Sequence, residues 1–372
     1  MKEIRILAYT NFNFGDDMFI YTLCKTFPNQ KFVLKADKSY KKTFGKLLNL
    51  SIHRISLVEK MYNIIVGACP NLYKKNVNTF GYSAIVYVIG GLFDEDDIWK
   101  KLVNKYGLKR LKNIMWKNSY DSNVPFFLLG CNITRVSSEK YINQMNFLFE
   151  GLRDICFRDK YSYDYFQKLD NTRYAPDIVF NYKCNLKNEK DKILISVWGP
   201  LTHTKSFPQW EWAKKLWKPY EKFIIEIAKE FAKLGKKVTL LALCENEGDL
   251  YACNKIKDNG QLDVDIVTYN GNLEEIISLF EKAYFVVGTR FHSIVMALNA
   301  KCAFYPIVYE SKSLQLLNDI KYSGNYSNIE DVTSYNVKNV LGNYKKNEVI
   351  NCEGIKADAS KQFKVLKDYL EL

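Results

Sequence analysis

The sequence predicts an α/β fold built from two Rossmann-like domains that face a cleft. Three observations lead to this prediction. The chain has 372 residues, which is long for a single hydrophobic core. Short apolar, β-rich runs alternate with helical segments along most of it, as in parallel βαβ units with helices on both faces of the sheet. A polar, lysine-rich stretch at residues 181–191 divides this pattern and is the predicted linker.

The first half of the pattern predicts an N-terminal domain at residues 1–183. A buried strand is expected at residues 4–9, followed by a helix over residues 17–27 and a strand over residues 31–36. Three further apolar strands, each ending in glycine or charged residues, span 84–89, 125–129 and 155–157. Glycine and charged side chains are therefore expected at the carboxyl edge of this sheet, where open α/β sheets bind ligands.

The second half predicts a C-terminal domain at residues 192–354. A helix is expected over residues 220–234, and Asn272 is expected to cap another helix, with Glu275 in the capping-box position three residues later. The expected strands are residues 193–197, 237–243, 263–268, 284–287 and 302–308. The last segment, residues 355–372, is predicted to form a terminal helix that packs back on the N-terminal domain.

The composition favours some partners over others. The formal net charge is +13 and the basic residues are spread along the chain, which suits a phosphorylated substrate or an anionic membrane face. Nucleic acid ranks last, because no zinc-finger, RNA-recognition or helix-turn-helix signature occurs. The nine cysteines form no C-x-x-C pair, and we recognise neither a signal peptide nor a membrane-spanning run. We therefore expect a reduced, cytoplasmic protein whose membrane contact is peripheral.

The most informative segment is residues 284–298, which read as a strand, a glycine, a basic residue, a histidine and an apolar helix. Arg290 and His292 are therefore expected where a strand ends and a helix begins, next to the free N–H groups of that helix. A guanidinium binds carboxylate or phosphate in a forked geometry, and an imidazole transfers protons near neutral pH. The pattern predicts an anionic substrate and a proton-transfer step. The alternative is a histidine that only caps the helix backbone.

Two neighbours extend this candidate site. Lys312 is expected to supply a second cation, provided that the loop after the strand at residues 303–308 folds over the site, and Ser293 is expected to contact the substrate. No cluster of Cys, His and Asp has metal-ligand spacing, and neither a P-loop nor a G-x-G-x-x-G fingerprint is present, so no metal or nucleotide cofactor is expected.

Two glycine-containing turns follow predicted strands of the first domain. The first carries the predicted substrate-binding residues Asn11, Asn13, Gly15, Asp16 and Asp17. Its asparagines can bond ligand hydroxyls and its glycine permits close approach, whereas the alternative is an ordinary helix-capping turn. The second turn carries Gly90, Gly91 and Asp94, where backbone N–H groups can face a ligand; the alternative is a plain strand-to-loop turn.

Two further segments have competing interpretations. Arg158 is a candidate substrate contact, but a structural ion pair with the adjacent Asp159 at the domain joint is favoured. Residues 207–218 contain three of the six tryptophans, set among lysines. Such a patch suits a membrane interface, although packing between the domains is slightly favoured.

These motifs, in this order, resemble those of the polysaccharide pyruvyl transferase family. The resemblance covers about residues 8–320, and the order and spacing of the motifs make it more specific than any one of them. The matching positions are Asn13, Gly15, Asp16 and Asp17; Gly90, Gly91, Phe93 and Asp94; Arg158, Asp159 and Ser162; Pro176 and Asp177; and Arg290, His292, Pro306 and Lys312. Leu92 departs from the family pattern, which often has a third glycine at that position.

The resemblance implies a GT-B-like transferase of capsule or exopolysaccharide biosynthesis. The implied donor is phosphoenolpyruvate and the implied product is a pyruvyl ketal on a sugar, with the donor on the C-terminal domain and the acceptor on the N-terminal domain. Arg290 and Lys312 would hold the donor, and His292 would act as the acid and then as a base. Asn13, Asp16 and Asp94 would orient the donor or the sugar. The reaction needs no metal or redox cofactor, and a lipid-linked acceptor at the inner face of the cell membrane suits the charge.

Two other functions fit the same sequence. The first is a nucleotide-sugar-dependent glycosyltransferase of the GT-B kind. The second is a carbohydrate-binding protein that kept the fold and lost catalysis, although the intact pair of Arg290 and His292 argues against it.

Overall fold

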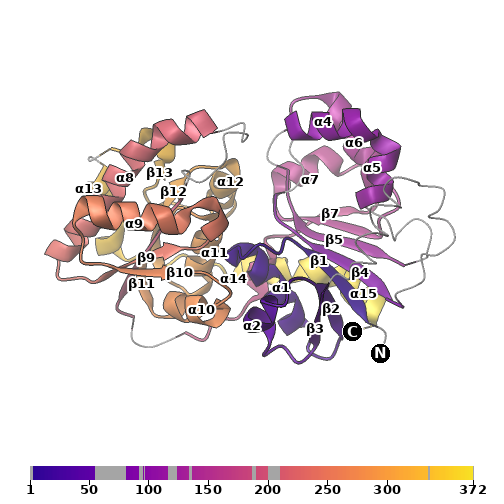
Figure 1. The fold of residues 1–372 in the computed structure, drawn as a ribbon, viewed down its shortest axis with the longest axis horizontal. Helices are drawn as coiled ribbons and strands as arrows, with labels where there is room; N and C mark the ends of the chain where they lie inside the picture. The colour runs from indigo at the N-terminus through magenta and orange to yellow at the C-terminus, as the bar shows by residue number, and fades with distance from the viewer. Residues whose placement is uncertain are drawn as a thin grey trace. The chain divides into compact units, whose positions relative to one another are not determined.

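The computed structural model describes residues 3–54, 81–91, 95, 97–115, 124–133, 136–186, 190–199, 210–333 and 336–371. The chain forms two compact units (Figure 1). The first unit comprises Met1–Tyr9, Phe19–Asn181 and Lys356–Leu372, and the second comprises Thr10–Met18 and Tyr182–Ile355. The short segment Thr10–Met18 thus belongs to the second unit, although the predicted domain boundaries placed it in the first.

The first unit is built on a seven-stranded parallel sheet with the order β3-β2-β1-β4-β5-β6-β7. Its strands are β1 (Ile4–Ala8), β2 (Phe32–Lys35), β3 (Leu50–His53), β4 (Ala84–Val88), β5 (Phe126–Cys131), β6 (Asp154–Phe157) and β7 (Thr172–Tyr174). Every residue of β5 and β6 is buried, as expected for central strands that are covered on both faces.

Helices connect these strands. They are α1 (Phe14–Thr26), α2 (Tyr40–Phe44), α4 (Asp97–Tyr106), α5 (Leu108–Met115), α6 (Glu139–Phe149), α7 (Lys160–Phe166) and the 3-10 turn η2 (Ile178–Asn181). The helix predicted over 17–27 begins three residues earlier, at Phe14, because Asn13 rather than an aspartate caps it: the side-chain oxygen of Asn13 accepts the N–H of Gly15 at 2.9 Å.

The C-terminal segment is a broken helix rather than the single helix predicted at 355–372. It consists of α14 (Glu353–Ala359), the 3-10 turn η6 (Ser360–Phe363) and α15 (Lys364–Leu370). The buried side chain of Gln362 explains the break, because it accepts the N–H of Gly130 at 3.1 Å and donates to the carbonyl oxygen of Ala175 at 2.7 Å. The chain end is therefore bonded to the first unit.

The second unit is built on a six-stranded parallel sheet with the order β10-β9-β8-β11-β12-β13. Its strands are β8 (Lys192–Ser196), β9 (Val238–Ala242), β10 (Asp265–Thr268), β11 (Ala283–Gly288), β12 (Ala303–Val308) and β13 (Ser327–Asn328). Its helices are α8 (Trp210–Lys233), α9 (Asp249–Gly260), α10 (Leu273–Glu281), α11 (Phe291–Asn299), α12 (Ser311–Asp319) and α13 (Asn336–Lys346), with 3-10 turns η4 (Glu245–Glu247) and η5 (Ile329–Asp331).

Two local predictions for the second unit are wrong. The helix expected at 220 begins at Trp210 and runs through Pro219. Asn272 and Glu275 form no capping box; the amide of Asn272 instead donates to the carboxylate of Glu275 at 2.7 Å, and its oxygen accepts the N–H of Asn270. Asn272 is nevertheless the N-cap residue of α10, as predicted, and only the hydrogen bonds of the capping box are replaced, by local bonds to Asn270 and Glu275.

Two tryptophans of the segment 207–218, Trp212 and Trp217, pack inside the second unit. Trp217 is buried in the core of the second unit, and the ring of Trp212 packs edge-on against Trp198 at 5.9 Å. The indole N–H of Trp212 donates to Glu330 at 2.6 Å. Residues 207–209 of this segment lie outside the described part of the chain. Packing within the second unit, and not a membrane interface, therefore accounts for these rings.

Each sheet has a point at which the strand order reverses. In the first sheet it lies between β1 and β4, and in the second between β8 and β11. Open α/β sheets bind ligands at the carboxyl ends of the strands beside such points. Among the described helices, none combines the length and apolar character needed to cross a lipid bilayer.

Candidate functional site

The strand-to-helix junction predicted around Arg290 and His292 is present beside the reversal point of the second sheet. Strand β11 ends at Gly288, Arg290 is the N-cap residue of α11, and His292 lies in the first turn of that helix. The backbone N–H of Arg290 points to the hydroxyl of Ser196, which ends β8, at 3.4 Å. The predicted location of this pair at a sheet edge is therefore confirmed.

The imidazole of His292 lies directly over Gly15. A side-chain carbon added to Gly15 would come within 1.8 Å of Nδ1 of His292, so no residue other than glycine fits this position without moving the ring. Gly15 lies in the first turn of α1, within the segment Thr10–Met18 of the second unit. This turn is bonded to the residue that follows β9, because the N–H of Phe14 donates to the carbonyl oxygen of Leu243 at 3.1 Å. The early turn and the histidine therefore form one half-buried site.

The guanidinium of Arg290 is held by two carboxylates. Its Nε and Nη2 bind both oxygens of Asp249, with an Nε to Oδ2 distance of 3.0 Å, and its Nη1 pairs with Glu247. The hydroxyl of Tyr309 accepts a further bond from Nη1 at 3.4 Å. Although burial disfavours the charged form, the carboxylates of Asp249 and Glu247 raise the pKa of Arg290 well above its usual value.

Asp249 is the centre of this arrangement. Its side chain has no exposed surface, and it also accepts the N–H groups of Gly199 at 3.0 Å and Cys244 at 2.9 Å. Asp249 thereby joins the chain segments that follow β8, β9 and β11. Glu247 differs, because 34% of its side chain is exposed. An anionic ligand that approaches Arg290 therefore meets Glu247 as the accessible competitor.

Lys312 lies in the first turn of α12 and not in a loop, as the sequence had suggested. Its ammonium pairs with Glu310 and lies 6.0 Å from the ring centre of Phe291, which contacts His292 edge-on. Burial opposes ionisation of Glu310, but the Lys312 ammonium outweighs it and lowers the pKa of the Glu310 carboxyl. Lys312 thus lies near the start of α11, with one carboxylate already beside it.

The remaining predicted residues of the second unit differ in exposure. The carboxyl of Asp17 is fully buried and accepts the hydroxyl of Tyr269; burial raises the pKa of Asp17 well above its usual value. The hydroxyl of Ser293 is buried and donates to the carbonyl oxygen of Arg290. Asn11 is exposed and Asp16 is half-buried, so these two side chains remain accessible to a ligand.

Two of the predicted residues of the first unit, Arg158 and Gly90, lie against each other. Arg158 is buried, with its Nη1 3.0 Å from Asp177 and its Nη2 2.7 Å from the side-chain oxygen of Asn132. Arg158 packs against Gly90, where an added side-chain carbon would lie 3.2 Å from Nη2. Gly91, which like Gly90 follows strand β4, is exposed. Asp94, together with Leu92 and Phe93, lies outside the described residues.

The favoured ion pair between Arg158 and Asp159 does not form. Asp159 instead caps α7, and its Oδ1 accepts the N–H of Ser162 at 2.7 Å. The extended backbone at Asp159 directs its carboxylate to the helix start, which leaves Asp177, nineteen residues away, to pair with Arg158. The arginine is nevertheless held by an internal ion pair, within the first unit.

Sequence reasoning missed Glu247, Asp249 and Tyr269. A signal for them existed, because each follows a strand that was predicted, at residues 237–243 or 263–268, and therefore lies at the same sheet edge as Arg290.

Within the described ranges, no group of three or more His, Cys, Asp and Glu side chains is arranged to hold a metal ion. Burial raises the pKa of the nearby Cys244 thiol, which disfavours its thiolate form.

The chain is similar in fold to several solved structures. HepE of Anabaena in complex with UDP-glucose is 10% identical, with all of both chains covered and a TM-score of 0.60. A putative UDP-N-acetylglucosamine 2-epimerase of Listeria monocytogenes is 9% identical over all of this chain and 96% of that one, with a TM-score of 0.58. The UDP-GlcNAc 2-epimerase of Neisseria meningitidis, bound to UDP-GlcNAc, is 11% identical over both full chains, with a TM-score of 0.53. Together with the two parallel sheets, these likenesses confirm the GT-B-like fold class.

A search of the curated proteins finds no match. The family model described as polysaccharide pyruvyl transferase matches residues 13–311, most of the chain. The matched range starts at the residue that caps α1 and includes Gly15, Arg158, Arg290 and His292. The chain therefore belongs to the polysaccharide pyruvyl transferase family, a family of transferases.

Proposed function

We propose that the protein transfers the pyruvyl group of phosphoenolpyruvate to a sugar of a cell-surface polysaccharide precursor. The observation that carries this proposal is the position of His292: an imidazole at the first turn of α11, placed against Gly15 within the range that the family model matches. A proton donor at a helix start suits a substrate that is anionic and must be protonated on carbon.

The proposed chemistry balances without a further reactant. His292 donates a proton to the methylene carbon of phosphoenolpyruvate, and a sugar hydroxyl attacks the neighbouring carbon. The phosphate bond to that carbon breaks, and a second hydroxyl of the sugar closes the ketal ring. One of the two hydroxyl protons replaces the proton that His292 gave to the methylene carbon, and the other leaves with the phosphate. His292 therefore recovers its proton when it accepts one from an attacking hydroxyl.

Binding of the donor is proposed to use the cations near α11. The positive end of the α11 dipole and the ammonium of Lys312 attract its carboxylate and phosphate. Arg290 contributes through Nη1, where the donor competes with Glu247, while Asp249 keeps the guanidinium in a fixed orientation. Asn11 and Asp16 are proposed to orient the sugar. Contacts from Asp94, Gly90, Gly91 and Arg158 stay predictions.

A phosphate-release assay tests the function. Phosphoenolpyruvate is incubated with the protein and with galactose- and mannose-type acceptors, both free and lipid-linked. Phosphate is expected to appear only when the correct sugar is present. Failure to release phosphate with any acceptor, with the folded protein at high concentration, contradicts the proposal.

A nucleotide-sugar-dependent glycosyltransferase is the second candidate. Its support is the likeness of the fold to proteins whose solved structures contain UDP-glucose or UDP-GlcNAc. Thermal stabilisation separates the two functions. Stabilisation by a nucleoside diphosphate and not by phosphoenolpyruvate favours the glycosyltransferase, and the reverse favours the pyruvyl transferase.

Replacement of Gly15 by alanine is expected to lower turnover by about 10²-fold, since a displacement of about 1 Å in a catalytic group costs that much. The new methyl group would occupy the place of Nδ1 of His292 and push the ring away. The matched control is Gly354→Ala, where no atom lies within 4 Å of the added carbon. Phosphate release is measured for both. Equal activity of Gly15→Ala and the wild type would show that the position of the ring is unimportant.

A further inference from the structure

Two helices of the first unit carry an unbalanced positive charge. Residues 98–115, which include nearly all of α4 and α5, contain five lysines and one arginine and no aspartate or glutamate. Four of the lysines, at positions 100, 101, 105 and 109, are exposed, whereas Lys112 is buried and pairs with Glu150 at 3.3 Å. We call Lys100, Lys101, Lys105 and Lys109 the basic face.

The inner sides of the two helices fix the basic face to the unit. Trp99 is buried, packs against Tyr141 at 5.7 Å, and donates its indole N–H to Gln144 at 2.9 Å. Leu111 is buried as well. Both helices are therefore anchored on α6 through apolar contacts, and α5 lies beside both α4 and α6 (Figure 1). The lysines project from a rigid support and not from a loose tail.

Apolar groups interrupt the basic face. Leu102, which follows Lys101 in α4, is 38% exposed. Phe147 of α6 is 36% exposed and lies beneath the ammonium of Lys112, which is not part of the basic face. The ring of Tyr106 lies 5.0 Å from the ammonium of Lys105. Lysines that surround exposed leucine and aromatic side chains are typical of helices that lie on a membrane surface. Nucleic-acid surfaces do not require such exposed apolar groups.

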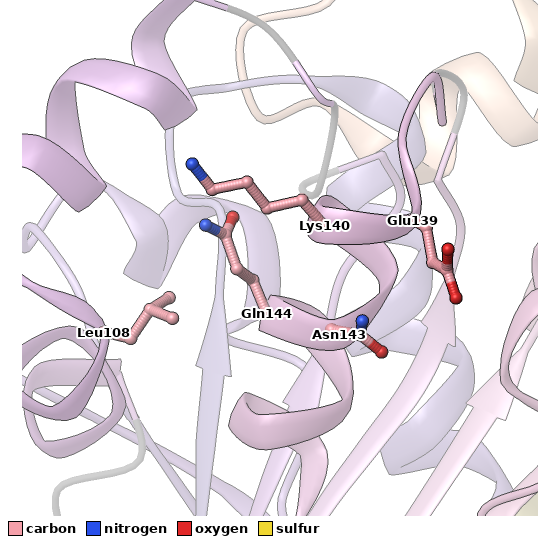
Figure 2. A pocket seen from close by; sticks show the side chains of 5 residues that line it. All are labelled: Leu108, Glu139, Lys140, Asn143 and Gln144. Atoms are coloured by element: carbon pink, nitrogen blue, oxygen red, sulfur yellow. The ribbon is translucent and has the colours of Figure 1, made fainter.

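An open surface pocket adjoins the same helices. It has a volume of about 500 Å³ and is lined by Leu108 of α5 and by Glu139, Lys140, Asn143 and Gln144 of α6. Figure 2 shows the side chains of Lys140 and Gln144 extending from α6 to the side on which Leu108 lies. An ammonium and amide groups are suitable donors for a phosphate-bearing head group.

Another lysine-rich helix, α8, serves as a contrast. Its lysines alternate with acids and form ion pairs with them, such as Lys218 with Glu221 at 2.9 Å and Lys222 with Glu226 at 3.9 Å. Its side chains Trp212 and Trp217 pack in the core of the second unit. Helix α8 therefore has the pattern of an ordinary solvated helix, in spite of its composition.

We infer that the basic face of α4 and α5 docks on an anionic lipid bilayer. The bilayer attracts each lysine close to its surface by about 1 kcal/mol, so the four lysines together raise partition onto it by roughly 10³-fold. Leu102 inserts at the level of the head groups. Docking would bring the protein to a lipid-linked acceptor. Only this consequence for the acceptor rests on the proposed pyruvyl transfer; the docking itself does not.

Vesicle binding tests the inference on the full chain. The wild type is mixed with vesicles of phosphatidylglycerol and phosphatidylcholine, and with vesicles of phosphatidylcholine alone. One variant carries Lys100→Gln, Lys101→Gln, Lys105→Gln and Lys109→Gln. The control carries Lys214→Gln, Lys215→Gln, Lys222→Gln and Lys229→Gln, which remove the same charge from exposed positions of α8. Circular dichroism verifies that both variants are folded.

The wild type and the control are expected to bind the anionic vesicles and not the neutral ones, with binding that weakens as salt is added. The variant of the basic face is expected to lose about 10³-fold in partition. Three results would each overturn the inference. The two variants lose vesicle binding equally, the variant of the basic face binds vesicles as the wild type does, or the wild type binds single-stranded RNA but no vesicle. Phosphate release with a free sugar acceptor should be unaffected by either variant, so failure of docking is distinguishable from failure of the proposed function.

Discussion

Replacement of His292 by alanine is expected to lower turnover by about 10²- to 10⁴-fold, the usual contribution of a positioned acid or base. The proposed reaction begins with protonation of an enol carbon, which water does slowly at neutral pH. The imidazole is held for this step by contact with Gly15 and by its place in the first turn of α11. Turnover is measured as phosphate released from phosphoenolpyruvate with a saturating acceptor.

The matched control is His53→Ala, since His53 is exposed on β3 of the first unit. It should retain full turnover. Circular dichroism and the melting temperature should show that His292→Ala keeps the fold. Wild-type turnover by His292→Ala would remove the histidine from the mechanism, whatever the family of the chain.

Replacement of Asp249 by alanine is expected to destabilise the second unit by about 3–5 kcal/mol, the usual cost of leaving one partner of a buried ion pair uncompensated. The fully buried carboxylate of Asp249 would be lost as an acceptor for two N–H groups of Arg290 and for the backbone N–H groups of Gly199 and Cys244. For a domain of this size the melting temperature should fall on the order of 10 °C.

Tryptophan fluorescence measures this change, because four of the six tryptophans, at positions 198, 210, 212 and 217, belong to the second unit. The matched control is Asp258→Ala, which removes an exposed carboxylate from the same helix, α9, and should change the free energy of unfolding by less than about 0.5 kcal/mol. A melting temperature of Asp249→Ala equal to that of the control would show that the ion pair is not a major support of the unit.

The sequence was sufficient for features that depend on neighbouring residues. The strand, glycine and helix around Arg290 and His292 were predicted because a single continuous segment carries their entire pattern. The alternation of strands and helices likewise predicted two parallel sheets, since the period of apolar residues is a local property.

Features that depend on distant partners were not predictable. Asp249 lies 41 residues before Arg290 in the chain, and nothing in its own neighbourhood shows that it is buried or which cation it meets. The sequence therefore suggested a free guanidinium where the structure has one held by two carboxylates. In the same way, glycine at position 15 suggested a tight turn or a close approach of a ligand, and its contact with the ring of His292 became evident from the fold.

The most direct test of the account follows carbon from phosphoenolpyruvate into the sugar. The donor carries a carbon label in its methylene group, and the acceptor is recovered and analysed after reaction with the wild type and with His292→Ala. We predict that the wild type places the label in a ketal methyl group of the sugar, while the variant transfers almost none. The account would be contradicted if the label stayed in the unreacted donor while the wild type glycosylated the same acceptor from a nucleotide-sugar.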